Sequence, residues 1–141
     1  MNRVSHAIAK VVLMDENGNL LIIRRSDSDP RRPLEWDVPG GWVDDGEDYS
    51  PAAAREIKEE TGFTVDIKNE NLAYCITDMT AHGSAIWFYY VAQVKNFEPV
   101  LSSEHDQYKW VSQDEALATI TYERMHNALE YIFTNKLKAG E

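Results

Sequence analysis

The sequence predicts an α/β protein in which a mixed β-sheet lies between helices. Three observations favour this fold. Strand-like runs stand on both sides of one short central helix, the strongest strand signal follows that helix, and an amphipathic helix ends the pattern. With 141 residues, the chain is expected to form one domain, residues 1–141, large enough to bury a core.

The first third of the chain is predicted to form two strands and a loop. Residues 4–14 are apolar and β-branched, as in a strand. Residues 15–19 hold an Asn-Gly pair and predict a turn, after which residues 20–24 return as a second strand. Residues 26–35 are polar and contain two prolines, so we expect an exposed loop.

The central helix is short and has clear ends. Ser50 and Pro51 are residue types that favour a helix start, and Gly62 favours its end. Ala53 and Ile57 are four residues apart and can face a core.

The second half is predicted to hold further strands and two helices. Strands are expected over residues 64–68, 72–78, 84–94 and 108–111, of which 84–94 is the strongest because it is rich in aromatic and β-branched residues. Helices are expected over residues 113–119 and 122–136. Apolar residues recur at helical spacing in the second of these: Met125, Ala128, Leu129, Ile132 and Phe133.

The composition limits the classes of partner. The formal net charge of −10 disfavours binding to a nucleic-acid duplex, which needs a positive surface. It does not disfavour small phosphorylated substrates, because bound metal ions reverse the local field. No segment is apolar and long enough to cross a bilayer, and the N-terminus lacks a secretory signal, so a cytoplasmic protein is expected. Cys75 is the single cysteine and is expected to be a buried thiol.

Three carboxylates are expected on one face of the central helix. Glu56, Glu59 and Glu60 are related as i, i+3 and i+4, and like charges at that spacing repel. A hard divalent cation removes this repulsion and takes the oxygens as ligands, which favours Mg²⁺ or Mn²⁺. Arg55 can pair with Glu59. The alternative is a solvated acidic face, which the well-bounded helix with its apolar side disfavours.

From Gly41 to Phe63 the sequence resembles the signature of the Nudix hydrolases, a MutT-like family. All the defining positions are filled: Gly41, Glu47, Arg55, Glu56, Ile57, Glu59, Glu60, Gly62 and Phe63. The runs LLIIRR at residues 20–25 and WDVPGG at residues 36–41 are similar to the segment that precedes the signature in many members. The resemblance implies an α/β/α sandwich with a mixed β-sheet and the signature loop-helix-loop.

The resemblance also implies roles for the signature residues. Glu56 and Glu60 would be the primary metal ligands, and Glu59 either a further ligand or the base that activates water. The backbone carbonyl of Gly40 would reach the metal, as in some relatives. Glu47 and Arg55 would orient the loop and the helix carboxylates.

A separate candidate, Glu104, lies before a predicted strand that contains Trp110. Many relatives place a glutamate there as a metal ligand or a base, and the alternative is an ordinary polar loop. The four histidines do not have zinc-ligand spacing, so each is expected to be a surface or structural residue.

Substrate contacts are predicted less sharply. Arg24 and Arg25 stand out among the arginines as candidate phosphate ligands, because they are expected beside the approach to Gly41, itself a candidate substrate contact. Tyr74 and His82 are further candidates for the pocket lining. Several aromatic residues could stack on a base, although burial in strands is favoured for most of them: Trp36, Trp87, Phe88, Tyr89 and Trp110.

The function implied by the resemblance is Mg²⁺- or Mn²⁺-dependent hydrolysis of a nucleoside diphosphate linked to a group X. The run Trp36–Gly41 departs from the Pro-Lys-Gly-type lead of the dinucleoside hydrolases, which favours a (deoxy)nucleoside triphosphate cleaved to a monophosphate and pyrophosphate. The tail from Glu104 is also similar to tails of asymmetric dinucleoside tetraphosphate hydrolases, so that activity, or hydrolysis of another nucleotide derivative, stays open. Further alternatives are an RNA-processing enzyme and a sensor that binds a nucleotide without cleaving it. Homodimers are frequent in the family.

Overall fold

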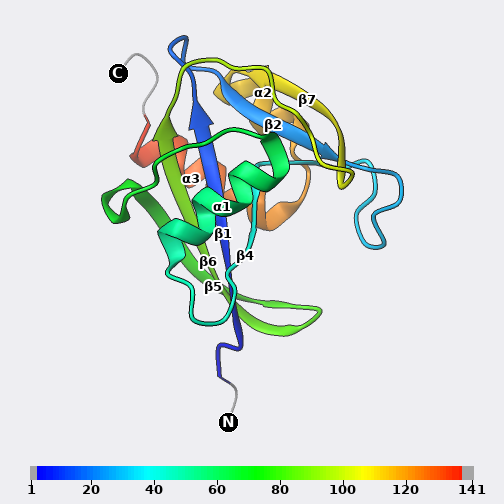
Figure 1. Ribbon diagram of the computed structural model, residues 1–141, viewed down its shortest axis with the longest axis vertical. Helices are drawn as coiled ribbons and strands as arrows, with labels where there is room; N and C mark the ends of the chain where they lie inside the picture. Colours follow the sequence, from blue (N-terminus) through cyan, green and yellow to red (C-terminus); the bar gives the residue numbers. More distant parts are fainter. Residues whose placement is uncertain (1–2, 138–141) are drawn as a thin grey trace.

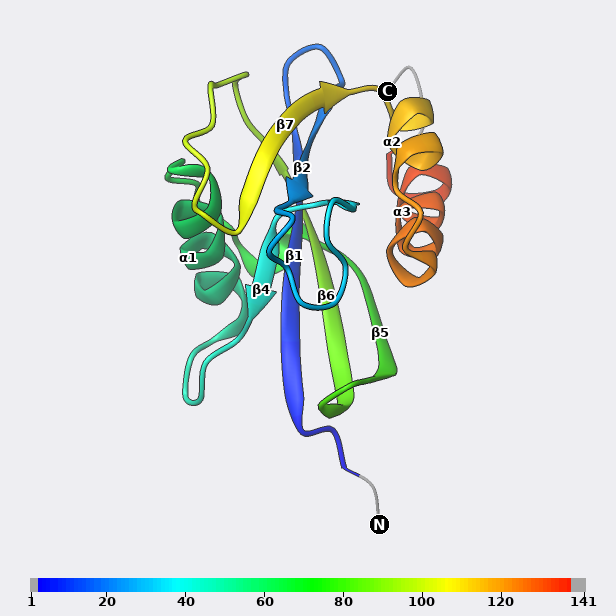
Figure 2. The same cartoon turned by 90° about the vertical axis from the view of Figure 1, so that its right-hand side faces the viewer.

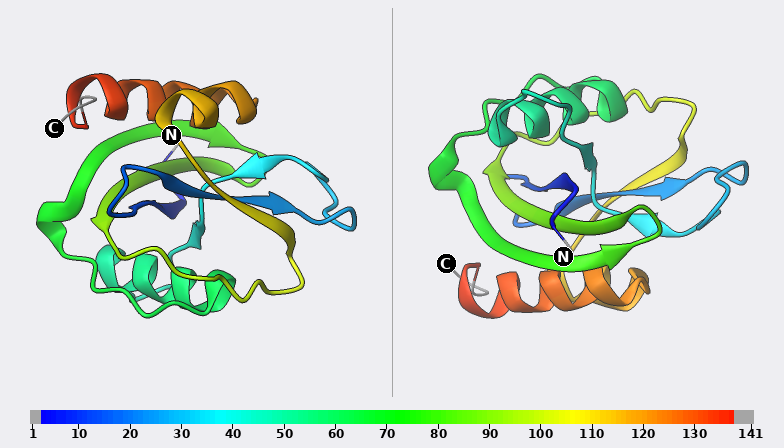
Figure 3. Two further views of the ribbon diagram at one scale, coloured as in Figure 1. Left: turned by 90° about the horizontal axis from the view of Figure 1, so that it is seen from above. Right: turned by 90° about the horizontal axis from the view of Figure 1, so that it is seen from below.

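The computed structural model, which describes residues 3–137, places a mixed β-sheet between helices (Figures 1 and 2). Helix α1 (Tyr49–Thr61) covers one face. Helices α2 (Gln113–Thr119) and α3 (Glu123–Asn135) cover the other, as the views along the sheet also show (Figure 3). The expected α/β/α sandwich is therefore confirmed.

The sheet is arranged around strand β1 (His6–Met14). β1 runs parallel to β6 (Gly83–Gln93) along its whole length, and β5 (Leu72–Thr80) pairs antiparallel with β6 at the sheet edge. On its other side, β1 pairs at Met14 with β2 (Leu20–Arg25) and at residues 8–10 with β4 (Gly40–Trp42). β2 and β4 pair with different parts of the same edge of β1, so the sheet divides into two branches along this edge.

The second branch of the sheet is built on β2. It pairs antiparallel with β3 (Trp36–Asp37) and with β7 (His105–Val111). This branch brings the loop between β2 and β3 and the start of β7 close to β4.

Alternation along β1 gives one core on each face of the sheet. Ala9, Val11 and Leu13 belong to the core under α1, which also holds the predicted helix residues Ala53 and Ile57. The residues at the even positions face α3. Lys10 lies among them, yet its side chain is charged and buried.

The secondary structure differs from prediction in several places. The strand expected over residues 108–111 begins at His105, and the short strands β3 and β4 were not predicted. Helix α1 begins at Tyr49 with Asp48 at the N-cap position, and Ser50 lies inside the helix, where its hydroxyl donates to the Asn69 side chain. Gly62 ends the helix with φ 77°, as predicted. The predicted strand at residues 64–68 is wrong: this segment pairs with no strand and leads into a short 3₁₀ turn, Asn69–Asn71.

The environment of Cys75 also differs from prediction. It is exposed because β5 is the edge strand of the sheet, where fewer neighbours cover each side chain. Within the described residues, no helix is long and apolar enough to cross a membrane.

Candidate active site

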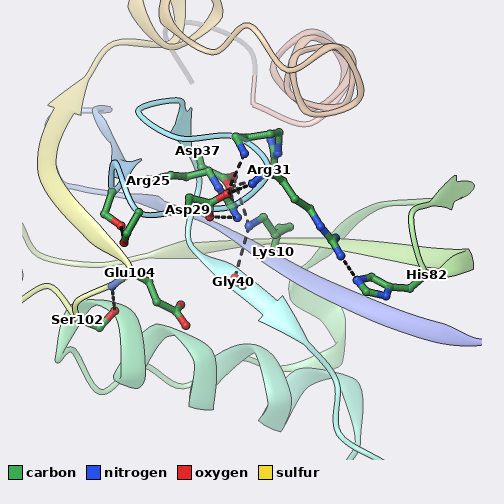
Figure 4. A network of polar contacts seen from close by, with 12 residues as sticks. Lys10, Arg25, Asp29, Arg31, Asp37, Gly40, His82, Ser102 and Glu104 are labelled. Carbon is green, nitrogen blue, oxygen red and sulfur yellow. Dashed lines mark hydrogen bonds and ion pairs between the residues drawn. The ribbon is translucent and has the colours of Figure 1, made fainter.

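A cavity of about 640 Å³ lies where β4, α1, the loop before β3 and the start of β7 meet. Its walls have opposite charge. One wall carries the carboxylates Glu56, Glu60 and Glu104. The other carries the cationic side chains Lys10, Arg25, Arg31, Arg32 and Arg124. Figure 4 shows part of this arrangement, with Glu104 beside helix α1, and Arg25 at the end of β2 and Arg31 on the loop that follows it. The cavity therefore suits a ligand that carries both anionic groups and bound cations.

Glu60 is the most deeply buried carboxylate of the acidic wall. Its side chain is only 6% exposed, and its Oε1 accepts a hydrogen bond of 2.7 Å from the backbone N–H of Gly40. Burial raises the pKa of the Glu60 carboxyl to about 8, although the positive charge of Lys10 opposes this shift. A carboxylate this poorly compensated would gain from a bound cation.

The two glycines of β4 make room for this wall. A Cβ on Gly41 would lie 2.6 Å from the carboxyl carbon of Glu56, so any larger residue would displace Glu56. Gly40 has φ 141°, and a Cβ there would lie 2.2 Å from the carbonyl oxygen of Ala9. Burial also raises the pKa of Glu56.

Arg55 connects the loop after β4 to helix α1. It donates to Glu47 through Nε at 2.8 Å and Nη2 at 3.0 Å, and to Glu59 at 2.9 Å. It also donates to Glu56 at 3.1 Å and to the carbonyl oxygen of Trp42 at 3.0 Å. The expected Arg55–Glu59 pair is present. Glu59 itself points to the outside of the helix, its side chain 57% exposed, and does not line the cavity.

Glu60, Glu104 and His105 form a group that fits a metal ion. One potential ligand atom from each lies within 4.8 Å of the others. His105 is buried, and burial lowers the pKa of its imidazole to about 4, so it is neutral and can act as a ligand. Two carboxylates in this group, with Glu56 nearby, suit a hard divalent cation.

The cationic wall is held together by two aspartates. Asp37 is fully buried and lies 3.3 Å from Lys10, 3.1 Å from Arg25 and 3.7 Å from Arg32. Asp29 accepts a 2.6 Å hydrogen bond from Arg25 and two more from backbone N–H groups of its own loop. These contacts fix the loop before β3 at the side of the cavity.

The predicted substrate residues divide into two groups. Arg25, Gly41 and His82 line the cavity. Arg24 lies outside it and forms a fork of two 2.9 Å hydrogen bonds to Asp106. Tyr74 also lies outside it and packs against Tyr131 of α3 at 4.7 Å between ring centroids.

Sequence reasoning missed or set aside several cavity residues. Arg31 and Arg32 were not distinguishable from ordinary surface arginines, and His105 was expected to be a surface or structural histidine. A signal did exist for Lys10, since a lysine in the middle of an apolar strand needs a partner. The signal for Trp42 was weaker and consisted only of its position directly after the two glycines.

Comparison with known proteins agrees with this fold. The sequence matches the NUDIX domain family over residues 4–132, and the chain belongs to this family of hydrolases, which act on phosphoanhydride bonds and generally use a divalent metal ion. A MutT protein from Methanosarcina mazei Go1 has a similar structure, with a TM-score of 0.79 and 26% identity over 96% of this chain and 99% of that one.

Two curated relatives match shorter segments. A putative 8-oxo-dGTP diphosphatase from Bacillus subtilis is 47% identical over 55 residues, which are 39% of this chain and 34% of that protein. The asymmetrical bis(5'-nucleosyl)-tetraphosphatase of Rattus norvegicus is 33% identical over 99 residues, 67% of each chain. The first match thus spans about a third of that relative's length, and the two names indicate different substrates.

Proposed function

We propose that this chain is a divalent-metal-dependent pyrophosphohydrolase that cleaves a (deoxy)nucleoside triphosphate to the nucleoside monophosphate and pyrophosphate. The observation that carries the proposal is the cavity with a carboxylate wall facing a cationic wall. The family membership supports cleavage of a phosphoanhydride. The departure of residues 36–41 from the lead of the dinucleoside hydrolases favours a triphosphate.

The metal ion would be held by Glu56 and Glu60, with Glu104, His105 and the Gly40 carbonyl beside them. A divalent ion at this position would shield the phosphate charge and lower the pKa of a bound water. These residues fit because carboxylate oxygens are ligands that Mg²⁺ and Mn²⁺ prefer.

The structure gives Glu59 and Glu104 different positions. Glu59 was a candidate ligand or base, but it lies outside the cavity and one of its oxygens accepts from Arg55. Glu104 lines the cavity. We therefore assign proton abstraction from the attacking water to Glu104, and assign Glu59, with Glu47 and Arg55, to holding helix α1 in position.

The cationic wall would hold the phosphates. Arg31 and Arg32 lie on the loop before β3, and Arg25 and Lys10 are fixed beneath it by Asp37. Guanidinium groups bind phosphate oxygens in pairs, so this wall orients the chain of phosphates along the cavity.

The test is chromatographic analysis of products. The purified protein is incubated with nucleoside triphosphates, a dinucleoside tetraphosphate, ADP-ribose and nucleotide sugars, each with Mg²⁺, Mn²⁺ or excess EDTA. We expect a monophosphate and pyrophosphate from a triphosphate, and no product with EDTA. Glu56→Gln and Glu60→Gln should remove the activity. Tight binding of a nucleotide without turnover would overturn the proposal and indicate a nucleotide sensor.

The second candidate is asymmetric dinucleoside tetraphosphate hydrolysis. It is favoured by the rat relative, which matches two thirds of the chain. A nucleoside triphosphate released from the dinucleotide, at a higher kcat/KM than for any triphosphate substrate, would establish it.

A further inference from the structure

Trp42 is an exposed aromatic residue in the cavity and lies next to the acidic wall. It follows Gly41 on β4, whose backbone touches Glu56, and it pairs with Ile8 of β1. Trp42 is 45% exposed although it lines the cavity. A single exposed aromatic residue is common on protein surfaces, so Trp42 is distinguished only by the way in which its ring is held.

The indole ring of Trp42 is held by His6. The two rings are stacked, with centroids 4.4 Å apart and planes 9° from parallel. Both nitrogens of His6 have partners, because Nδ1 lies 3.1 Å from the hydroxyl of Ser5 and Nε2 lies 3.0 Å from the hydroxyl of Thr80. The support is therefore rigid, and a ligand that stacks on Trp42 loses little free energy to ordering of the protein.

Trp42 is nearly half exposed, and His6 and His82 are the aromatic contacts that the described residues make with its ring. His6 covers one face of the ring. His82 stands at a steep angle, with its centroid 5.2 Å from that of Trp42 and 6.4 Å from that of His6. Together with the 4.4 Å between Trp42 and His6, these distances place the three ring centroids at the corners of a triangle with a nearly right angle at Trp42. His82 therefore lies beside the Trp42 ring and not over the face opposite His6. Arg31 donates a hydrogen bond to His82 and so borders the same position (Figure 4).

Trp87, the other indole that lines the cavity, has no free face. It is only 5% exposed. Tyr89 stacks beside it at 6.4 Å, and the guanidinium of Arg124 lies 5.0 Å from its ring centre. Arg124 is held in turn by a 2.7 Å hydrogen bond to Asp78. Trp87 is therefore closed to a ligand unless Arg124 moves.

We propose that the face of Trp42 opposite His6 is the platform on which the base of the substrate stacks. This inference rests on the proposed function and extends it: the site selects polyphosphates that carry an aromatic base over inorganic or aliphatic ones. A base on Trp42 lies one residue from Gly41, so its phosphates reach Glu56 and the metal-binding group on one side and Arg31 on the other. Stacking recognises the aromatic plane, so the platform accepts purines and pyrimidines alike.

The experiment compares Trp42→Ala and Trp42→Phe with the wild type. With a nucleoside triphosphate and Mg²⁺, we expect KM to rise about tenfold in the alanine variant and less in the phenylalanine variant, since stacking on one aromatic side chain has about this effect. The kcat should change little. Inorganic tripolyphosphate carries no base, so its inhibition constant should stay unchanged in both variants.

Two further variants complete the comparison. Trp36→Phe changes a tryptophan outside the cavity and should leave KM unchanged. Trp87→Phe tests the closed indole, and a larger rise of KM there than in Trp42→Ala would overturn the proposal. An unchanged KM in Trp42→Ala, or an equal loss of affinity for nucleotide and tripolyphosphate, would also overturn it.

A binding measurement separates this proposal from the proposed function. Quenching of tryptophan fluorescence by a nucleoside triphosphate in EDTA needs no turnover, and we expect the quenching to be lost in Trp42→Phe and kept in Trp36→Phe. If the wild type cleaves no nucleotide, the proposed function fails, while this titration still decides whether Trp42 holds the base.

Discussion

Each wall of the cavity is organised by one residue whose charge is opposite to that of the wall: Arg55 in the acidic wall and Asp37 in the cationic wall. These two residues differ in burial. Arg55 pairs with four acidic residues, and its side chain is 30% exposed. Asp37 pairs with three cationic residues, and its side chain is 1% exposed. Exposed ion pairs contribute little to stability, whereas loss of one partner from a buried group leaves charges without compensation. The acidic wall therefore depends on its organising residue for orientation, and the cationic wall depends on Asp37 for folding.

The largest effect is expected for Asp37→Asn. The substitution leaves Lys10 and Arg25 facing a neutral amide, so the free energy of unfolding should fall by about 3–5 kcal/mol, as for other buried pairs that lose one partner. Urea denaturation measures this change. Asp106→Asn removes the more exposed pair with Arg24 and serves as the matched control, with a much smaller expected loss of stability. Equal losses in the two variants would contradict the difference between buried and exposed pairs.

Glu60→Gln should separate stability from activity. The amide keeps the acceptor for the Gly40 N–H but carries no charge, so we expect kcat/KM to fall at least about 100-fold, as when a principal electrostatic group is lost. Without metal, the variant should be no less stable than the wild type, because burial already disfavours the charged form of Glu60. Glu70→Gln, in the 3₁₀ turn away from the cavity, is the control. A normal kcat/KM in Glu60→Gln would show that Glu60 is not part of the active site.

Arg55→Lys tests the orienting role directly. Lysine keeps the positive charge but cannot form the fork that joins Glu47, Glu59 and the Trp42 carbonyl. We expect kcat/KM to fall about 10- to 100-fold, the usual effect of losing a group that orients metal ligands, with a change in unfolding free energy below about 1 kcal/mol. Steady-state kinetics and urea denaturation of the same sample give both values. A large loss of stability with normal activity would reverse the roles assigned to Arg55 and Asp37.

The two walls also differ in how far the sequence predicts them. Apart from Glu104, the acidic wall comes from one continuous segment, residues 40–60, so helical spacing alone places Glu56 and Glu60 together. The sandwich fold was predictable for the same reason, since its strong strands and helices carry local patterns. The irregular structure of residues 64–68 was not predictable from local patterns, because a strand needs a partner and none lies beside this segment.

The cationic wall is assembled from separate elements. Lys10 comes from β1, Arg32 from the loop between β2 and β3, and Arg124 from α3, and only the tertiary fold brings them to one cavity. The stacked pair of Trp42 and His6 depends on the pairing of β1 with β4. No spacing along the chain carries this information, because it is set by contacts distant in sequence.

The smallest effect is expected at Asp29, which holds the loop of the cationic wall. Burial raises the pKa of its carboxyl, but hydrogen bonds from the backbone of Arg32 and Arg31 and from the Arg25 side chain outweigh it and lower the pKa from 3.8 to about 2. A depressed carboxyl pKa stabilises the fold above the unfolded value, and this contribution disappears as the pH falls through the folded value. Asp29→Asn should therefore be less stable than the wild type by about 1 kcal/mol at neutral pH, the size of one hydrogen bond. The difference should close between about pH 4 and pH 2.

Urea denaturation at several pH values measures the Asp29 effect, and Asp27→Asn in the same loop is the control. If the gap between the wild type and Asp29→Asn persisted unchanged at pH 2, the ionised carboxylate would not be what holds the loop. Lys10, Arg25 and Arg32 would then depend on Asp37 alone, which sharpens the contrast with Arg55: a single buried charge would fix three of the cationic side chains that face the carboxylates.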